Sequence, residues 1–280
     1  MSAPDLCRLQ TARAVARRFQ VGPQHRLGQN FLVSPGVRDA IVARVDPGIP
    51  ALEIGCGLGA LSQGLLQQGM ELTGLELDPN CVAALRLLQA DHPRFRVFQA
   101  DALAVSPEAL GLAPPYQVVA NLPYQITGAI LPRLMEWRPQ PATCRLLVQR
   151  EVARRLTADL GDWSLATLAL RLVATVTWEF DVDPQSFWPP PKVWSSLIEL
   201  RPRPDGRPEL LPELLGLARP IFQMRRKQIH HGLSRALGGN SDLAFEILAA
   251  AGIEPTRRPG SLGLEDWQRL LQERREQQLG

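Results

Sequence analysis

Four consecutive residues, Asn121-Leu122-Pro123-Tyr124, combine groups that could hold a nucleobase and make one of its amino groups reactive. The Asn121 side-chain oxygen is one hydrogen-bond acceptor, and the Leu122 carbonyl, which precedes the rigid Pro123, is a second. An exocyclic aromatic amine is a poor nucleophile because its lone pair is delocalised. Two acceptors for its hydrogens would favour a pyramidal nitrogen able to attack a methyl sulfonium. Tyr124 offers an aromatic face for a base removed from its helix, although the tetrapeptide could also form a plain β-turn.

A glycine-rich turn at residues 55–59 follows the short apolar run 51–54. Glycines let the backbone turn tightly and approach a ligand without a Cβ clash. Glu76, about 20 residues further on, could accept hydrogen bonds from two ribose hydroxyls. The turn is GxGxG rather than the dinucleotide pattern GxGxxG, and no Lys-Ser/Thr pair follows that could hold a triphosphate with magnesium. The pattern therefore favours a nucleoside pocket over a tight connection alone.

Hydrophobic periodicity predicts the elements that must position these residues. Strands are expected at residues 51–54, 71–77, 96–99, 116–120 and 144–149, and helices between the first two strands and at 35–45, 82–90, 150–156 and 165–172. Ligands in open α/β sheets bind outside the carboxyl ends of the strands, where the tetrad and Asp101 fall. Asp101 could accept a hydrogen bond from an adenine amino group, or it could cap a helix or loop.

The second half of the chain predicts a different arrangement. Residues 174–182 and 197–200 form a closely spaced pair of strands, which requires one antiparallel strand in an otherwise parallel sheet. A Pro/Arg-rich stretch at 201–212 indicates a linker. Helices expected at 214–237, 243–251 and 264–273 would form a small helical domain.

Composition limits the class of protein. The 280 residues are 45% hydrophobic, which is enough for one α/β domain and a smaller appendage. No apolar run approaches the roughly 18 residues of a membrane helix, and no signal peptide is present, so we expect a soluble, cytoplasmic protein. Four dispersed cysteines, Cys7, Cys56, Cys81 and Cys144, argue against a disulfide framework and against a metal site.

Basic residues gather in two places although the net charge is only +3. Residues 214–241 contain no acid, and Arg225, Arg226 and Lys227 fall there. Residues 8–26 hold a second basic set, and a short helix there would carry Leu6, Leu9, Val15 and Phe19 on one side. Such clusters are typical of proteins that bind a polyanion, although each could be a solvated helix face. The N-terminal residues could be an RNA-facing arm, a loose tail or an organelle transit segment.

With Glu53 before the first glycine and Glu76 ending the next strand, the chain resembles motifs I and II of the S-adenosylmethionine-dependent methyltransferases. The resemblance implies S-adenosylmethionine as cofactor and S-adenosylhomocysteine as product. It places Glu53 near the methionine end, Glu76 on the ribose, Asp101 on the adenine, and Gly55 and Gly57 against the cofactor.

Residues 28–32, GQNFL, resemble the cofactor lid of the ribosomal RNA adenine dimethylases. The resemblance implies that Asn30, Leu32 and Asn121 contact the cofactor. Taken without the resemblance, GQNFL is a loop in which an aromatic side chain packs. The segments GQNFL, EIGCG, LELD, NLPY, QREVA, PPPKVWSS and FQMRRKQI occur in the order found in the KsgA/RsmA dimethyladenosine transferase family, and they cover residues 25–270. Phe187 would then lie on the target base opposite Tyr124, and Arg225, Arg226 and Lys227 would hold RNA phosphate.

The resemblance implies a basic tail at residues 1–24, a Rossmann-like class I methyltransferase domain at 25–202, and a helical RNA-binding domain at 203–280. The sheet would be mostly parallel and seven-stranded, with one antiparallel strand. The expected reaction is N6-dimethylation of two adjacent adenosines in the 3′-terminal hairpin of 16S rRNA. The substrate would be the small ribosomal subunit or its precursor, the role ribosome biogenesis, and the enzyme a monomer.

Two alternatives remain. One is an erythromycin-resistance type methylase of 23S rRNA, against which FQMRRKQI and the long C-terminal region argue. The other is a non-catalytic ribosome-assembly or transcription factor, against which the intact tetrad argues. Two departures from the family pattern stand out: Cys56 replaces a frequent proline, and residues 161–165, GDWSL, replace a stretch that usually contains tyrosine. The second leaves open how the helix after QREVA meets RNA.

Overall fold

The computed structural model describes residues 4–22 and 29–279. The chain divides into two compact units, one of Met1–Ala153 and Val176–Pro202, the other of Arg154–Thr175 and Arg203–Gly280. The segment Arg154–Thr175 thus groups with the C-terminal helices, and the chain leaves the first unit and returns to it. The predicted domains 1–24, 25–202 and 203–280 stay a prediction, and Arg26 and Gly28 lie outside the described residues.

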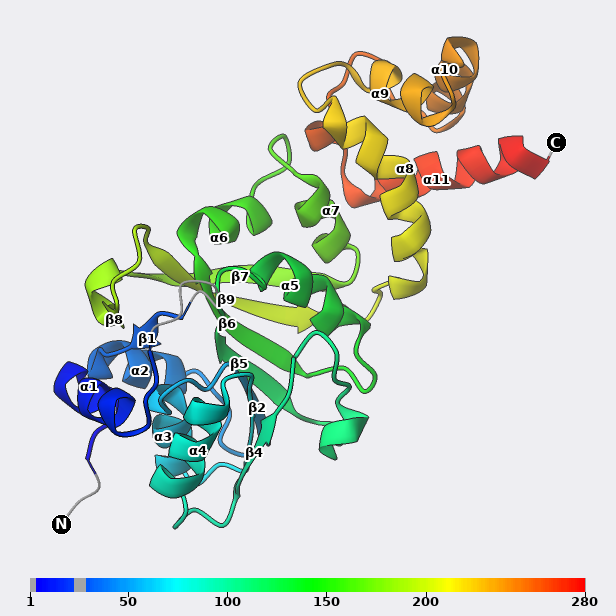
Figure 1. Ribbon diagram of the computed structural model, residues 1–280. Helices are drawn as coiled ribbons and strands as arrows, with labels where there is room; N and C mark the ends of the chain where they lie inside the picture. Colours follow the sequence, from blue (N-terminus) through cyan, green and yellow to red (C-terminus); the bar gives the residue numbers. More distant parts are fainter. Residues whose placement is uncertain (1–3, 23–28, 280) are drawn as a thin grey trace. The chain divides into compact units, whose positions relative to one another are not determined.

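Within the described ranges, seven strands form one sheet in the order β4-β3-β2-β5-β6-β9-β7 (Figure 1). Their bounds are β2 Ala51–Ile54, β3 Leu72–Glu76, β4 Phe95–Gln99, β5 Gln117–Asn121, β6 Thr143–Gln149, β7 Ala174–Val182 and β9 Ser195–Pro202. The neighbours from β4 to β6 pair in parallel, whereas β9 runs antiparallel to β6. The predicted sheet with one antiparallel strand is confirmed.

The strand order reverses between β2 and β5. From β2 the chain builds outward through β3 and β4, then returns to pair β5 with the other side of β2, with Ile54 opposite Ala120. Such a reversal leaves a crevice outside the carboxyl ends of the two strands, because their following connections run to opposite sides. The glycine turn and the tetrad both begin at this crevice.

Helices of the first unit cover the sheet and supply its core. Their bounds are α1 Leu9–Arg18, α2 Pro35–Val42, α3 Ala60–Gln67, α4 Pro79–Leu88, α5 Thr127–Glu136 and α6 Arg150–Leu156, the last continuing into the second unit. Ile41 of α2 and Leu65 of α3 pack in one buried cluster with Leu72 and Val119 of the sheet. The α4 helix begins at Pro79 rather than at 82, because the Asp78 side chain accepts the Asn80 backbone N–H and caps it. The α5 helix was not predicted.

The N-terminal residues are part of the first unit's core. A helix forms there as predicted, but its buried residues are Ala12, Val15 and Ala16, whereas Leu9 is exposed. Ahead of the helix, Asp5 pairs with Arg38 at 2.6 Å, and the backbone N–H of Leu6 donates to Gln63. The expectation of a loose tail is therefore wrong for residues 4–22, because this segment has its own buried contacts.

The second unit is helical. Its described helices are α7 Leu165–Arg171, α8 Leu211–Gln223, α9 Ile229–Ala236, α10 Ser241–Ala250 and α11 Leu264–Leu279. Phe222 stacks on the fully buried Trp267 with ring centres 5.4 Å apart. Residues 161–165, which differ from the family pattern, are part of this unit. Trp163 is buried, Ser164 caps α7, and the Gly161 N–H donates to the Gly260 carbonyl. None of the helices among the described residues is both long and apolar enough to cross a lipid bilayer.

The predicted helix 214–237 is wrong, because two helices and a turn occupy this stretch. The turn lets α9 fold back on α8, and Gly232 approaches so closely that a Cβ there would lie 2.9 Å from the Ile221 Cα. The backbone N–H of Lys227 donates to the Met224 carbonyl and stabilises the turn. A continuous helix would have kept Ile221 and Gly232 apart along one axis.

Candidate active site

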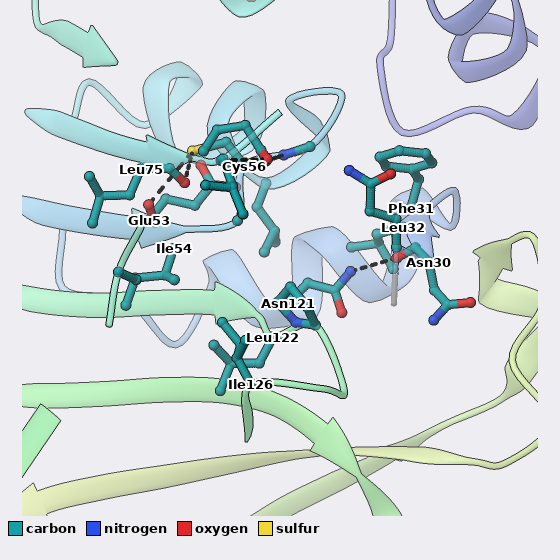
Figure 2. Close-up of a pocket in the computed structure, with 18 of the residues that line it drawn as sticks. Asn30, Phe31, Leu32, Glu53, Ile54, Cys56, Leu75, Asn121, Leu122 and Ile126 are labelled. Carbon is teal, nitrogen blue, oxygen red and sulfur yellow. Dashed lines mark hydrogen bonds between the residues drawn. The ribbon is translucent and has the colours of Figure 1, made fainter. Parts of the chain in front are cut away.

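The predicted site residues meet at the crevice between β2 and β5. A Cβ on Gly55, which follows β2, would lie 3.4 Å from the Pro123 Cδ, which follows β5. A cavity opens here, and its walls come from the segments after β2, β3, β4 and β5 together with residues 29–32 of the GQNFL segment (Figure 2). The predicted residues that line it are Asn30, Leu32, Glu53, Gly55, Gly57, Glu76, Asp101, Asn121, Leu122, Pro123 and Tyr124.

The glycine turn requires glycine for two physical reasons. Gly55 and Gly57 have φ values of +73° and +53°, in the left-handed region that side chains disfavour. A Cβ on Gly57 would also lie 3.0 Å from the Phe31 ring. Cys56, which departs from the family pattern, is buried with its Sγ near the carbonyls of Glu53 and Leu75. The cysteine thus fills the space behind the turn.

Glu53 lines the cavity and is almost fully buried. Its Oε2 accepts a hydrogen bond from the Ser62 hydroxyl at 2.5 Å. Burial raises the pKa of the Glu53 carboxyl to about 8; the Ser62 hydrogen bond lowers it, and the Glu76 carboxylate raises it further. A positively charged group beside Glu53 would favour its ionised form.

Glu76 is held by the backbone at the end of β3. Its Oε2 accepts the Gly57 N–H at 2.7 Å, and its Oε1 accepts the N–H groups of Leu77 and Asp78 at 2.8 and 2.9 Å. Burial raises its pKa, and these three donors oppose the rise. An ionised carboxylate has about four acceptor sites, so Glu76 keeps capacity for a ligand hydroxyl.

Asp101 makes the loop contact that the sequence left open, and its predicted contact with adenine stays a prediction. Its Oδ1 accepts the backbone N–H of Leu103 at 2.9 Å, as expected of a loop carboxylate. The residue is exposed and also lines the cavity after β4. One carboxylate oxygen can therefore support the loop while the other serves the cavity.

Asn121 is oriented by the lid segment. Its Nδ2 donates to the backbone carbonyl of Asn30 at 2.8 Å, as the dashed line in Figure 2 shows. Only the nitrogen of the amide can donate to a carbonyl, so this bond fixes the Asn121 side-chain oxygen on the other branch of the amide. The sequence predicted an acceptor at this position, and the lid contact determines where the acceptor oxygen lies.

Tyr124 is tied to the start of β9. Its hydroxyl lies 2.9 Å from the Ser195 hydroxyl, and the residue lines the cavity. Burial raises the pKa of the Tyr124 hydroxyl, and the Ser195 hydrogen bond opposes the rise. In the same tetrad, the backbone N–H of Leu122 donates to the Leu147 carbonyl, and the Pro123 carbonyl accepts from Ile126 and Thr127. The tetrad is therefore built into the fold.

Phe187 lies beside the lid rather than in the cavity wall. The two-residue strands β1 Phe31–Leu32 and β8 Phe187–Trp188 pair antiparallel, with Leu32 opposite Phe187. The Phe187 side chain is buried in the same cluster as Leu32 and Leu147. The structure thus joins the lid to the aromatic segment, while the predicted stacking of Phe187 on a base stays a prediction.

Arg225, Arg226 and Lys227 belong to the second unit. All three are exposed and lie in the turn between α8 and α9, not on a helix as expected. Three exposed cations that are consecutive in the chain raise the local positive potential of this turn. Their role in RNA binding stays a prediction.

Sequence reasoning missed two hydroxyls that support the site. Ser62 on α3 donates to Glu53, and Ser195 bonds Tyr124. Ser62 lies nine residues after Glu53 in the first turn of α3, a place that faces the preceding strand end in a strand-turn-helix unit. Ser195 lies 71 residues from Tyr124, and only the antiparallel insertion of β9 brings the two together.

Comparisons with known proteins agree with this geometry. Residues 23–270 match the family described as Ribosomal RNA adenine dimethylase. The chain is 35% identical over 277 residues to a Ribosomal RNA small subunit methyltransferase A of Dehalococcoides mccartyi (strain CBDB1), covering 97% of this chain and 94% of the relative.

Two solved structures share the fold. A dimethyladenosine transferase from Plasmodium falciparum is 25% identical with a TM-score of 0.74, covering 89% of this chain and 98% of its own. The 23S rRNA methyltransferase ErmE is 29% identical with a TM-score of 0.67, covering 87% and 99%. The predicted Rossmann-like class I fold is confirmed. The chain belongs to the ribosomal RNA adenine dimethylase family and is a methyltransferase.

Proposed function

We propose that the protein dimethylates N6 of two adjacent adenosines in the 3′-terminal hairpin of 16S rRNA, within the small ribosomal subunit or its precursor. The observation that carries the amino-directed chemistry is the fixed amide of Asn121, whose nitrogen is engaged by the Asn30 carbonyl. The amide oxygen then serves as an acceptor for an amino hydrogen of the substrate.

The cavity residues fit S-adenosylmethionine, which when bound would supply an electrophilic methyl group. Glu53 fits the cationic methionine end, because its buried carboxyl has a pKa of about 8 and lacks a cationic partner among the described residues. Glu76 fits the ribose and Asp101 the adenine. The backbone at Gly55 and Gly57 and the lid residues Asn30 and Leu32 would enclose the cofactor.

The tetrad would prepare the adenine amino group. The Asn121 oxygen and the Leu122 carbonyl accept its two hydrogens, and Tyr124 stacks on one face of the base, with Phe187 facing the other. No general base is required before attack, because the proton can leave once the nitrogen is cationic. The catalytic contribution is then positioning and electrostatic stabilisation.

The choice of the small subunit rests on the printed names of relatives that are 35% identical over nearly the whole chain. The similarity to ErmE supports a second candidate, methylation of 23S rRNA. In the sequence, FQMRRKQI and the long C-terminal region argue for the first candidate. We propose that the protein acts as a monomer in the cytoplasm, where its ribosomal substrate would be assembled.

The test is methyl transfer from methyl-labelled S-adenosylmethionine to unmethylated small subunits and, separately, to naked large-subunit RNA. We expect label in the small subunit only, recovered after nuclease digestion as N6-dimethyladenosine. Label in the large-subunit RNA alone would replace the proposal with the 23S activity. Label in neither, with retained subunit binding, would favour a non-catalytic assembly or transcription factor.

Asn121→Ala tests the amino-group acceptor in the same assay. We expect turnover to fall by at least about 100-fold, the typical contribution of a positioned polar group, while calorimetry shows nearly unchanged cofactor binding. A variant at the supporting hydroxyl, Ser195→Ala, is the matched control and should lose far less. An unchanged rate for Asn121→Ala, or loss of cofactor binding that accounts for the whole effect, would refute the assigned role.

A further inference from the structure

Trp194 is a large aromatic side chain left 43% exposed next to the candidate site. Because β9 runs antiparallel to β6, its first residue Ser195 lies opposite Gln149, the last residue of β6. The residue before β9 therefore lies at the same end of the sheet as the carboxyl ends of the parallel strands drawn in Figure 1. Residues that follow β2 and β5 at this end line the cavity. Tryptophan is enriched at binding interfaces, because its large ring offers contact area and its N–H a polar end.

The indole is held in place. The backbone N–H of Arg150 donates to the Trp194 carbonyl at 2.9 Å, and the Arg150 guanidinium lies 5.6 Å from the centre of the indole. Asp181 fixes the other side of this guanidinium through an ion pair of 3.0 Å and accepts the Ser196 hydroxyl at 2.7 Å. A pre-positioned aromatic ring loses little conformational entropy on binding.

Trp194 is also connected to the tetrad. The next residue, Ser195, bonds the Tyr124 hydroxyl at 2.9 Å. Ser195 therefore links the two aromatic residues, because its side chain bonds Tyr124 and its backbone directly follows Trp194. The nucleotide that adjoins a base at Tyr124 is accordingly the natural partner of the exposed indole.

We propose that Trp194 and Arg150 form a binding subsite for the unpaired base next to the target adenosine. The indole, positioned by Arg150, stacks on that base, and the exposed Lys192 in the loop that carries Trp194 favours the adjoining phosphate. This inference rests on the proposed function, because it requires an RNA substrate with a base held at Tyr124. Stacking is tolerant of sequence, so the subsite serves either of two neighbouring adenosines.

The test compares Trp194→Ala, Trp194→Leu and Trp194→Phe in the full chain, with Val193→Ala as a control at the neighbouring residue, which is 44% exposed. For each variant, kcat and KM are measured for the ribosomal substrate that the wild-type protein labels, together with cofactor affinity and Tm. We expect Ala and Leu to raise KM roughly 5- to 100-fold, with cofactor affinity unchanged within about twofold. Phe should restore most of the loss, and Val193→Ala should behave as wild type.

The leucine variant separates stacking from packing. Leucine keeps apolar bulk over Arg150 but has no aromatic face, so it tests the π-stack even if Trp194→Ala unfolds. An unchanged KM in Trp194→Leu overturns the inference, as does a KM increase that Phe fails to restore. The proposed function fails independently if the wild-type protein labels large-subunit RNA, and KM for that RNA then tests the subsite.

Discussion

At the scale of single residues, the cavity works by placing carboxylates where water cannot fully solvate them. Glu53 accepts the Ser62 hydroxyl but remains almost completely buried, and its pKa rises to about 8. Glu76 is similarly buried but is cradled by three backbone donors. The two acids therefore differ in environment, which agrees with the proposal that Glu53 faces a cation and Glu76 ribose hydroxyl groups.

The wild-type protein should lose stability as pH rises, because its buried Glu53 carboxyl must ionise. Glu53→Gln should remove this loss. Between the ordinary pKa of 4.5 and the folded value of about 8, the folded protein holds a proton that the unfolded chain has released. The free energy of unfolding therefore falls as pH rises through this window and levels off above it. The variant should gain in Tm over the wild type from about pH 5 to pH 8.5, by an energy on the order of a few kcal/mol.

Calorimetric scans across this range provide the measurement. The matched control is Glu136→Gln at the exposed end of α5, which removes a carboxyl outside the cavity. A Tm difference for Glu53→Gln that does not change with pH would show that its carboxyl is not held in an unfavourable environment.

At the scale of elements, close approaches rather than propensities decide several boundaries. The α8 and α9 helices meet where Gly232 lies against the Ile221 backbone, and this contact requires the turn that carries Arg225, Arg226 and Lys227. In the first unit, β1 and β8 pair over two residues only, yet this pairing brings the lid and Phe187 together. A strand of two residues such as β1 or β8 is stable only because it pairs with the other.

Gly232→Ala should destabilise the second unit, because the new Cβ would lie 2.9 Å from a backbone atom that cannot rotate away. The expected loss is about 1–3 kcal/mol, the usual cost of overpacking. Gly216→Ala on the exposed face of α8 meets open space and should instead stabilise by roughly 0.5–1 kcal/mol. Denaturant unfolding followed by circular dichroism would measure both, and equal effects of the two substitutions would contradict the close-approach argument.

At the scale of the whole molecule, the cavity and the basic turn at residues 225–227 belong to different compact units. The cavity belongs to the first unit, and the exposed turn with Arg225, Arg226 and Lys227 to the second. A single net charge of +3 conceals this division, since acids elsewhere offset the basic clusters. Affinity for RNA and the rate of methyl transfer should therefore be separable by mutation.

Replacing Arg225, Arg226 and Lys227 by alanine should weaken RNA binding in a salt-dependent way. If all three contact phosphate, the slope of log affinity against log salt should become shallower by about 2, while cofactor affinity stays unchanged. The control variant removes the same number of positive charges by replacing three exposed arginines with alanine. Arg94 and Arg138 precede β4 and β6, at the end of the sheet opposite the cavity, and Arg86 lies on α4. Equal slopes for the two triple variants would show that charge alone, and not the position of the turn, matters.

The sequence by itself determined the elements whose signals are local. The glycine turn, the acid ending β3, the tetrad after β5 and the antiparallel strand could all be predicted, because glycine geometry, apolar runs and loop lengths act over a few residues. These local signals were enough to place Glu53, Glu76 and Asn121 at one edge of a parallel sheet.

The tertiary structure alone decided what depends on contacts between distant segments. It ordered residues 4–22 through Asp5 with Arg38, divided the expected helix at the Gly232 contact, and brought Ser195 to Tyr124. It also oriented the Asn121 amide through the Asn30 carbonyl, 91 residues away in sequence. Neither partner carries a local pattern that identifies the other, because each hydrogen bond arises only when the packed chain brings the two atoms within reach.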